Sequence, residues 1–145
     1  RYGLGIGTSS TRRALAARLE SAGAEPVTVV HPGAHIGADC RLADGVVVYQ
    51  GAVVTTDVQL GRHTHLNVGV AVQHDSVVGD FVQVSPAVAI NGDCAVGDDV
   101  FLGTGAIVTR GVTIGAAARV GAGSVVLHDV AAGTTVVGAP ATPTL

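Results

Sequence analysis

Residues 72–96 read VQHDSVVGDFVQVSPAVAINGDCAV, and a branched aliphatic residue returns at every sixth position of this stretch. The same register runs without an insertion from Val30 to Val126. A helix repeats at about 3.6 residues and an isolated strand at about 2, so neither explains a period of six. The period predicts a hexapeptide parallel β-helix, in which short strands alternate with tight corners. The register consists of Val30, Ile36, Leu42, Val48, Val54, Leu60, Leu66, Val72, Val78, Val84, Ile90, Val96, Leu102, Val108, Ile114, Val120 and Val126.

A second, smaller residue follows each aliphatic at the fourth position, as Ala34, Cys40 and Val46 do. We expect both residues to point inward, with three hexads forming one triangular coil. Coils would stack at about 4.8 Å, the ordinary strand spacing, and bury an aliphatic column that one coil alone cannot bury. The low aromatic content, 3%, suits a narrow interior. The sequence therefore predicts an all-β fold, a parallel β-helix of about six coils over residues 30–145.

Composition narrows the class of protein further. The chain has 145 residues and a net charge of −3, which disfavours a nucleic-acid surface because such a surface needs a basic stripe. No apolar run has the length of a membrane span and no signal peptide is visible, so we expect a cytoplasmic protein. Cys40 and Cys94 occupy equivalent inward positions three coils apart. That separation, roughly 14 Å, is too long for a disulfide and predicts two free core thiols.

Residues 1–29 do not follow the hexad register. We predict a short strand over residues 2–6, a helix over residues 11–22 with hydroxyl caps from residues 8–10, and a second strand over residues 27–30. Leu15 and Leu19 would face inward, and Arg12, Arg13 and Arg18 would face water. This strand–helix–strand unit fits either the tail of a nucleotide-binding α/β domain whose front is missing or a small cap on the β-helix.

Two histidine patterns stand out at predicted corners. His74-Asp75 can form a general base with a carboxylate that fixes its tautomer, because histidine side chains titrate near neutral pH. His128-Asp129 occupies the same hexad positions three coils later, so the pattern alone does not choose between the pairs. His63 and His65 could bind a metal, but no third ligand is evident and we favour solvated corner residues.

The segment from residue 66 to residue 82 carries Asn67, His74-Asp75 and Gly79-Asp80-Phe81, and residues 137–141 read Val-Gly-Ala-Pro-Ala. These motifs resemble the sugar O-/N-acyltransferase family, which includes sialic acid O-acetyltransferases and bacillosamine or perosamine N-acetyltransferases. The resemblance covers essentially the whole chain and implies a left-handed β-helix. It also implies that residues 1–29 are the C-terminal part of a Rossmann-like domain that holds a nucleotide sugar.

The same resemblance assigns roles to individual residues. It implies His74 as general base with Asp75 as its orienter, and Gly7 and Asn67 as contacts to the substrate. Acetyl-CoA would lie between two subunits of a homotrimer, and no metal is implied. The implied coenzyme contacts, mainly through backbone amides, are Gln83, Gly92, Thr104 and Ala122.

Three departures from the family pattern bear on the site. Gln83 stands where several relatives have a second histidine, so a titrating group is lost although hydrogen bonding is kept. Gln73 replaces a usual acidic residue. The C-terminus lacks the usual Lys or Arg after the proline, so any pairing with a coenzyme phosphate must come from elsewhere.

The resemblance implies an acetyl-CoA-dependent acetyltransferase that acts on the amino group of a nucleotide-linked amino sugar, with O-acetylation of sialic acid or another sugar as the alternative. A γ-carbonic-anhydrase-like metal site is a competing hypothesis for this fold, but His63, His65 and His74 lack the usual ligand spacing. A non-enzymatic scaffold is disfavoured by the intact His-Asp motif.

Overall fold

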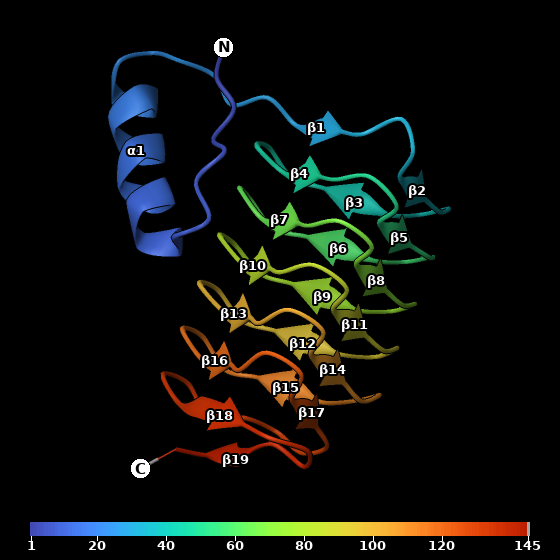
Figure 1. Cartoon of the computed structure of the whole chain (residues 1–145). Coiled ribbons are helices and arrows are strands. Elements are labelled where there is room, and N and C mark those ends of the chain that lie inside the picture. Colours follow the sequence, from blue (N-terminus) through green and yellow to red (C-terminus); the bar gives the residue numbers. More distant parts are fainter. Residues whose placement is uncertain (145) are drawn as a thin grey trace.

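The computed structural model describes residues 1–144, and they form one helix beside a three-sided column of short parallel strands (Figure 1). The helix is α1, Ser9–Ser21. Nearly all strands are two residues long, as the hexad register requires. They are β1 Val29–Val30, β2 His35–Ile36, β3 Arg41–Leu42, β4 Val47–Val48, β5 Val53–Val54, β6 Gln59–Leu60, β7 His65–Leu66, β8 Ala71–Val72, β9 Val77–Val78, β10 Gln83–Val84, β11 Ala89–Ile90, β12 Ala95–Val96, β13 Phe101–Leu102, β14 Ile107–Val108, β15 Thr113–Ile114, β16 Arg119–Val120, β17 Val125–Val126, β18 Thr135–Val137 and β19 Thr142–Pro143.

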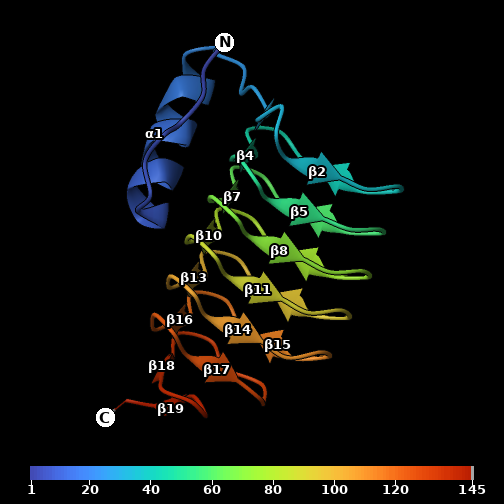
Figure 2. The same ribbon diagram turned by 45° about the vertical axis from the view of Figure 1, so that its right-hand side comes forward.

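The strands pair into three parallel sheets, which are the faces of the column (Figure 2). Face I contains β1, β4, β7, β10, β13, β16 and β18; face II contains β2, β5, β8, β11, β14 and β17; face III contains β3, β6, β9, β12 and β15. Each strand pairs with the strand one coil away, so that Gln83 lies between His65 and Phe101 on face I. Among the strands of residues 1–144, only β19 pairs antiparallel, and it packs against β18 at the C-terminal end of face I.

The interior of the column is the aliphatic core that the hexad register predicts. Leu66, Ile90 and Leu102 have no exposed surface, and the smaller inward residues Val46 and Ala106 are equally buried. Each inward residue stacks on its counterpart in the next coil, so burial of apolar area accumulates along the column. The predicted β-helix is confirmed. Cys40 and Cys94 are both free, as expected, with Cys94 buried and Cys40 partly buried.

The successive corners from Asp39 to Gly123 each carry a residue in the left-handed backbone region at the same hexad position. Asp75 has φ 60° and Asp93 has φ 59°, and even Phe81 has φ 57°. A left-handed residue turns the chain sharply, and Gly, Asp and Asn accept this conformation at low cost. The corner geometry therefore dictates where each corner side chain points. The series is Asp39, Gly45, Gly51, Asp57, His63, Gly69, Asp75, Phe81, Ala87, Asp93, Asp99, Gly105, Gly111, Ala117 and Gly123.

The N-terminal unit is a reduced strand–helix–strand motif that packs along face I (Figures 1 and 2). The predicted strand over residues 2–6 is only a single parallel bridge between Tyr2 and Pro26. The strand predicted over residues 27–30 is β1, which joins the column. Helix α1 begins at Ser9 after Thr8, and no side chain caps it, contrary to our expectation of a hydroxyl cap.

Three polar side chains that we expected to face water are buried where this unit meets the column. Arg12 is 0% exposed, His63 1% and His65 3%. Tyr2 stacks on His63, and Phe81 stacks on its other side, with ring centroids 5.9 and 5.0 Å apart. The prediction of solvated residues was wrong because it took no account of the N-terminal unit, which covers this part of face I.

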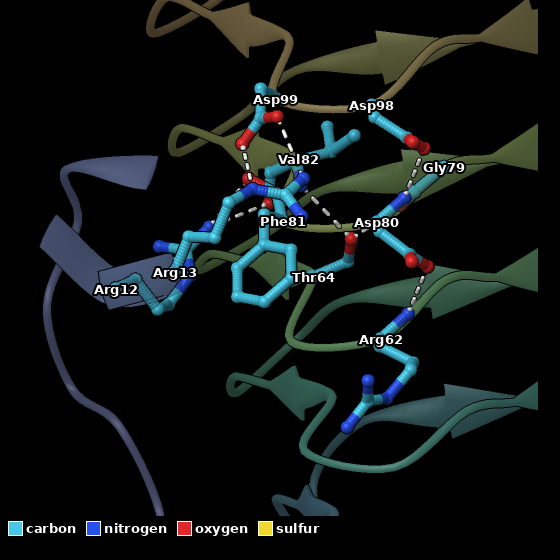
Figure 3. A network of polar contacts seen from close by, with 10 residues as sticks. All are labelled: Arg12, Arg13, Arg62, Thr64, Gly79, Asp80, Phe81, Val82, Asp98 and Asp99. Atoms are coloured by element: carbon cyan, nitrogen blue, oxygen red, sulfur yellow. Dashed lines mark hydrogen bonds and ion pairs between the residues drawn. The ribbon is translucent and has the colours of Figure 1, made fainter. Parts of the chain in front are cut away.

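The Gly79-Asp80-Phe81 motif has a structural role in this junction (Figure 3). Asp80 Oδ1 accepts a hydrogen bond from the Arg62 amide at 2.7 Å, and Asp98 Oδ1 accepts one from the Asp80 amide at 2.8 Å. The carboxylates thus tie successive corners together, and Phe81 packs against the helix. Within residues 1–144, no helix has the length and apolar character that crossing a membrane requires.

Candidate active site

His74 and Asp75 form a hydrogen-bonded pair at the edge between faces II and III, in the corner that joins β8 to β9. Nδ1 of His74 lies 2.7 Å from Oδ2 of Asp75. The corner is held in place because the Asp75 amide donates to Thr56 O and the Asp93 amide donates to His74 O. A carboxylate can only accept, so Nδ1 carries the proton and the lone pair lies on Nε2. Nε2 has no hydrogen-bond partner among residues 1–144, and it is free to act as a base.

Gly92 lies directly against the imidazole, one coil further along the same edge. A Cβ atom at this position would be 2.6 Å from Nε2 of His74. Separations below about 3 Å between carbon and ring atoms are not tolerated in a packed structure. Gly92 was expected to bind the coenzyme, and the structure adds that its lack of a side chain leaves room for the His74 ring.

The second His-Asp pair is different. Asp129 Oδ1 accepts a hydrogen bond from the Thr113 amide at 2.7 Å, and no His128–Asp129 hydrogen bond occurs in the described chain. The carboxylate of Asp129 is therefore committed to the backbone, whereas that of Asp75 orients an imidazole. The structure separates two motifs that the sequence pattern left equivalent.

A second carboxylate, that of Asp93, lies close to the His74–Asp75 pair. One ligand atom from each of His74, Asp75 and Asp93 lies within 4.8 Å of the others. Arg110 donates to Asp93 Oδ2 at 2.7 Å, which neutralises that carboxylate. The competing three-histidine site does not form within the chain, because His63 and His65 lie beneath the N-terminal unit while His74 lies on another edge.

The other candidate residues fall into two separate places. Asn67, Thr104 and Ala122 follow β7, β13 and β16 and lie on the edge between faces I and II. Asn67 Oδ1 accepts a hydrogen bond from the amide of the next residue at 2.8 Å. Gly7 and Gln83 lie in a cleft between α1 and face I. A single chain thus does not bring all of the predicted site residues together.

The cleft beside α1 has a volume of about 630 Å³ and combines cationic, aromatic and hydroxyl groups. Arg119 stacks on Phe101 with its guanidinium carbon 4.6 Å from the ring centroid. Arg13 donates to both carboxylate oxygens of Asp99, at 3.2 and 2.7 Å. The cleft is lined by Gly7, Thr8, Ser9, Ser10, Arg13, Gln83, Ser85, Asp99, Phe101, Ala117 and Arg119.

Burial shifts the titration of two groups behind this cleft. Burial lowers the pKa of Arg12 to about 10, so its guanidinium stays charged at neutral pH. Burial, with the nearby Arg12 charge as the second cause, lowers the pKa of His65 to about 4 and keeps its imidazole neutral. Sequence reasoning missed Arg12, although it shares a helical stripe with Ala16 and Leu19, which face the column.

Comparison with known proteins gives the geometry a family context. Residues 93–128 match the sequence family described as bacterial transferase hexapeptide (six repeats). The structure of a perosamine N-acetyltransferase variant from Caulobacter crescentus, solved with CoA and GDP-perosamine, is 35% identical and superposes with a TM-score of 0.97. The match covers 99% of this chain and 68% of that one. The chain belongs to the family of hexapeptide-repeat sugar acetyltransferases.

Other solved members of the sugar acetyltransferase family agree with this assignment. The acetyltransferase domain of PglB from Neisseria gonorrhoeae is 30% identical, with a TM-score of 0.96 over 98% of this chain and 69% of its own. WeeI from Acinetobacter baumannii is 31% identical, with a TM-score of 0.94 over the same shares. No curated protein sequence matches the chain significantly. The predicted left-handed hexapeptide β-helix and the predicted acyltransferase class are confirmed.

Proposed function

We propose that this chain transfers the acetyl group of acetyl-CoA to the amino group of a nucleotide-linked amino sugar, with His74 as general base. One observation carries the proposal: His74 has an oriented Nδ1 and a free Nε2, in a chain 35% identical to a perosamine N-acetyltransferase that was solved with CoA and GDP-perosamine. No metal takes part in the proposed reaction.

The chemistry follows from the two nitrogen atoms of His74. Nε2 takes a proton from the sugar amine as the amine nitrogen attacks the thioester carbonyl carbon, and a tetrahedral intermediate forms. Asp75 holds the ring in the correct tautomer and stabilises the imidazolium. The intermediate then expels the coenzyme sulfur, which receives the proton from Nε2. The products are the N-acetyl sugar and CoA, and His74 returns to its starting form.

The complete site is proposed to form between subunits of a homotrimer. The outward residues of face II are apolar over most of its length, with Val53 and Ile107 each 40% exposed and Ala71, Ala89 and Val125 between or beside them. His74 and Gly92 lie on one border of face II, and Asn67, Thr104 and Ala122 lie on its other border. If face II of each subunit turns towards a three-fold axis, the first border of one subunit meets the second border of the next.

The N-terminal unit, residues 1–29, is proposed to take part in binding the nucleotide sugar. Gly7 is the residue of this unit that is proposed to contact the sugar nucleotide. Coenzyme contacts are proposed for Gln83, Gly92, Thr104 and Ala122. Gly7 and Gln83 share one cleft, which supports a site where both ligands approach the same part of face I.

The proposal is tested with purified full chain, acetyl-CoA and a panel of amino-sugar nucleotides, with release of the coenzyme thiol as the readout. Sialic acid serves as the hydroxyl acceptor. We expect turnover of an amino-sugar nucleotide that falls by a factor of about 100 or more in His74→Ala, because a positioned general base contributes this much. His128→Ala is the matched control and should keep wild-type turnover. Equal activity of both variants would refute His74 as the base.

A further inference from the structure

Arg12 is a buried cation that has no carboxylate partner within residues 1–144, and it joins the N-terminal unit to the column (Figure 3). Nη1 donates to Ile6 O at 2.6 Å, within the N-terminal segment. Nη2 donates to Phe81 O at 2.8 Å and to Val82 O at 3.1 Å, on the column. A buried charge without a counter-ion is costly. The burial of Arg12 is therefore explained by the groups that its guanidinium holds in position.

Two side chains of the column lie at hydrogen-bond distance from Arg12, His65 and Gln83, and Gln83 makes the shorter contact. Nη1 of Arg12 lies 3.0 Å from Oε1 of Gln83. A guanidinium has only donors, so the atom that faces it must be the amide oxygen. The amino group of Gln83 consequently points away from Arg12. Gln83 is 7% exposed, and its remaining exposure is towards the cleft, where Nε2 has no partner within residues 1–144.

We propose that Arg12 is a positioning residue that fixes Gln83 as a donor-only contact for an oxygen atom of the acyl-donor coenzyme. A free glutamine offers either its oxygen or its amino group to a ligand, whereas a glutamine locked by Arg12 offers only N–H. This inference rests on the proposed function, and it adds the direction of the hydrogen bond and the residue that sets it.

The same guanidinium explains why a glutamine can replace a histidine at this position. His65 lies beside Arg12, with Nδ1 3.5 Å from Nη1, and its imidazole is neutral. An imidazole at position 83 would meet the same charge and would also stay neutral, with one nitrogen accepting from Arg12 and the other donating into the cleft. Glutamine supplies the same acceptor and donor without a titrating group.

The test compares three substitutions of Gln83 in the full chain, with Gln59→Glu as control. Gln59 occupies the equivalent outward hexad position on face III, away from α1. Gln83→His keeps one acceptor and one donor, Gln83→Glu keeps the acceptor for Arg12 but presents a carboxylate to the cleft, and Gln83→Leu removes both. The affinity for CoA is measured by calorimetry. Steady-state kinetics with acetyl-CoA give KM and kcat, and Tm is measured without ligand.

We expect Gln83→Glu to raise the Kd of CoA and the KM of acetyl-CoA about tenfold or more, with kcat much less affected, because one donor is lost and an anion faces the ligand oxygen. Gln59→Glu should bind like wild type, and Gln83→His, which keeps a donor towards the cleft, should bind CoA more tightly than Gln83→Glu. Wild-type-like CoA binding by Gln83→Glu would overturn the coenzyme contact, and so would CoA binding by Gln83→His that is as weak as that of Gln83→Glu.

The Tm series tests the orientation of Gln83 independently of any activity. Gln83→Leu should lower Tm because Arg12 loses a buried acceptor, and Gln83→Glu should keep or raise it because a carboxylate accepts from Arg12 more strongly. A Tm of Gln83→Leu at or above the wild-type value would overturn the proposed lock. If wild type itself neither binds CoA nor turns over, the proposed function and the coenzyme contact both fail, while the Tm series still decides whether Arg12 holds Gln83.

Discussion

The imidazole of His74 rests against the bare Cα of Gly92, one coil away, and a methyl group on Gly92 would lie 2.5 Å from Cε1 of His74. The imidazole of His74, the proposed base, is thus positioned from two sides. Asp75 fixes Nδ1 at 2.7 Å, and Gly92 leaves the only room on that side for the ring. Gly92, which has no side chain, therefore helps to position the His74 ring, as the Asp75 carboxylate does.

Gly92→Ala should reduce kcat about 100-fold, because a displacement of about 1 Å in a catalytic group costs a factor of this size. The backbone should accept the alanine, since Thr56, Arg110 and His128 occupy the equivalent corner position in other coils. The measurement is kcat together with Tm. Gly5→Ala is the control, because a Cβ there meets nothing within 4 Å. Unchanged kcat in Gly92→Ala would show that the ring is free to move without loss.

Asp75→Asn should lower kcat by a factor of roughly 10 to 100, because the amide no longer fixes the tautomer or stabilises the imidazolium. Asparagine tolerates the left-handed conformation of Asp75, φ 60°, so the corner should remain intact. Asp129→Asn is the matched control at the equivalent position. Steady-state kinetics of both variants measure kcat. A comparable loss of kcat in Asp75→Asn and Asp129→Asn would mean that the loss comes from a disturbed fold.

The repeat made most of the column predictable from sequence. An inward aliphatic at every sixth residue leaves few alternatives, because any other period would expose Leu66, Ile90 or Leu102. The motif around His74 was predictable for the same reason, since its hexad position fixes the corner on which it lies. The choice of His74 over His128 came from the resemblance and stays a prediction. The structure shows that the two pairs differ, because Asp129 accepts a hydrogen bond from the Thr113 amide.

The junction with the N-terminal unit was not predictable from the hexad pattern. The hexad register predicts which residues point outward from the column, but it does not predict which other segments of the chain cover them. His65 and Gln83 point outward on face I, and α1 with its preceding segment buries them. Arg12 was assigned to water because arginine is rarely buried. Arg12 is buried because it donates hydrogen bonds to the carbonyl oxygens of residues 81 and 82. Residue propensities do not predict such tertiary hydrogen bonds.

Ala89→Arg should weaken the proposed trimer and reduce activity together, because a charged side chain in the middle of face II would be buried against a neighbouring subunit. Ala95→Arg is the control, since residue 95 occupies the same outward hexad position on face III. Sedimentation and the thiol-release assay measure the two effects. A wild-type chain that sediments as a monomer would contradict the shared site, as would an unaltered assembly in Ala89→Arg.

Stability should fall between about pH 6.5 and about pH 4 because of His65, whose pKa is lowered to about 4 from an ordinary value of 6.5. The unfolded chain takes up a proton in this range and the folded chain does not, so protons favour unfolding as the pH drops. The contribution is fully present above pH 6.5, and its loss by pH 4 should be on the order of 3 kcal/mol. His65→Gln should flatten this part of a profile of unfolding free energy against pH, measured by urea denaturation. His35→Gln, at an exposed position on face II, should leave the slope unchanged. The same acid slope in wild type and His65→Gln would place the titrating group elsewhere, with His63, whose pKa burial also lowers, as the next candidate.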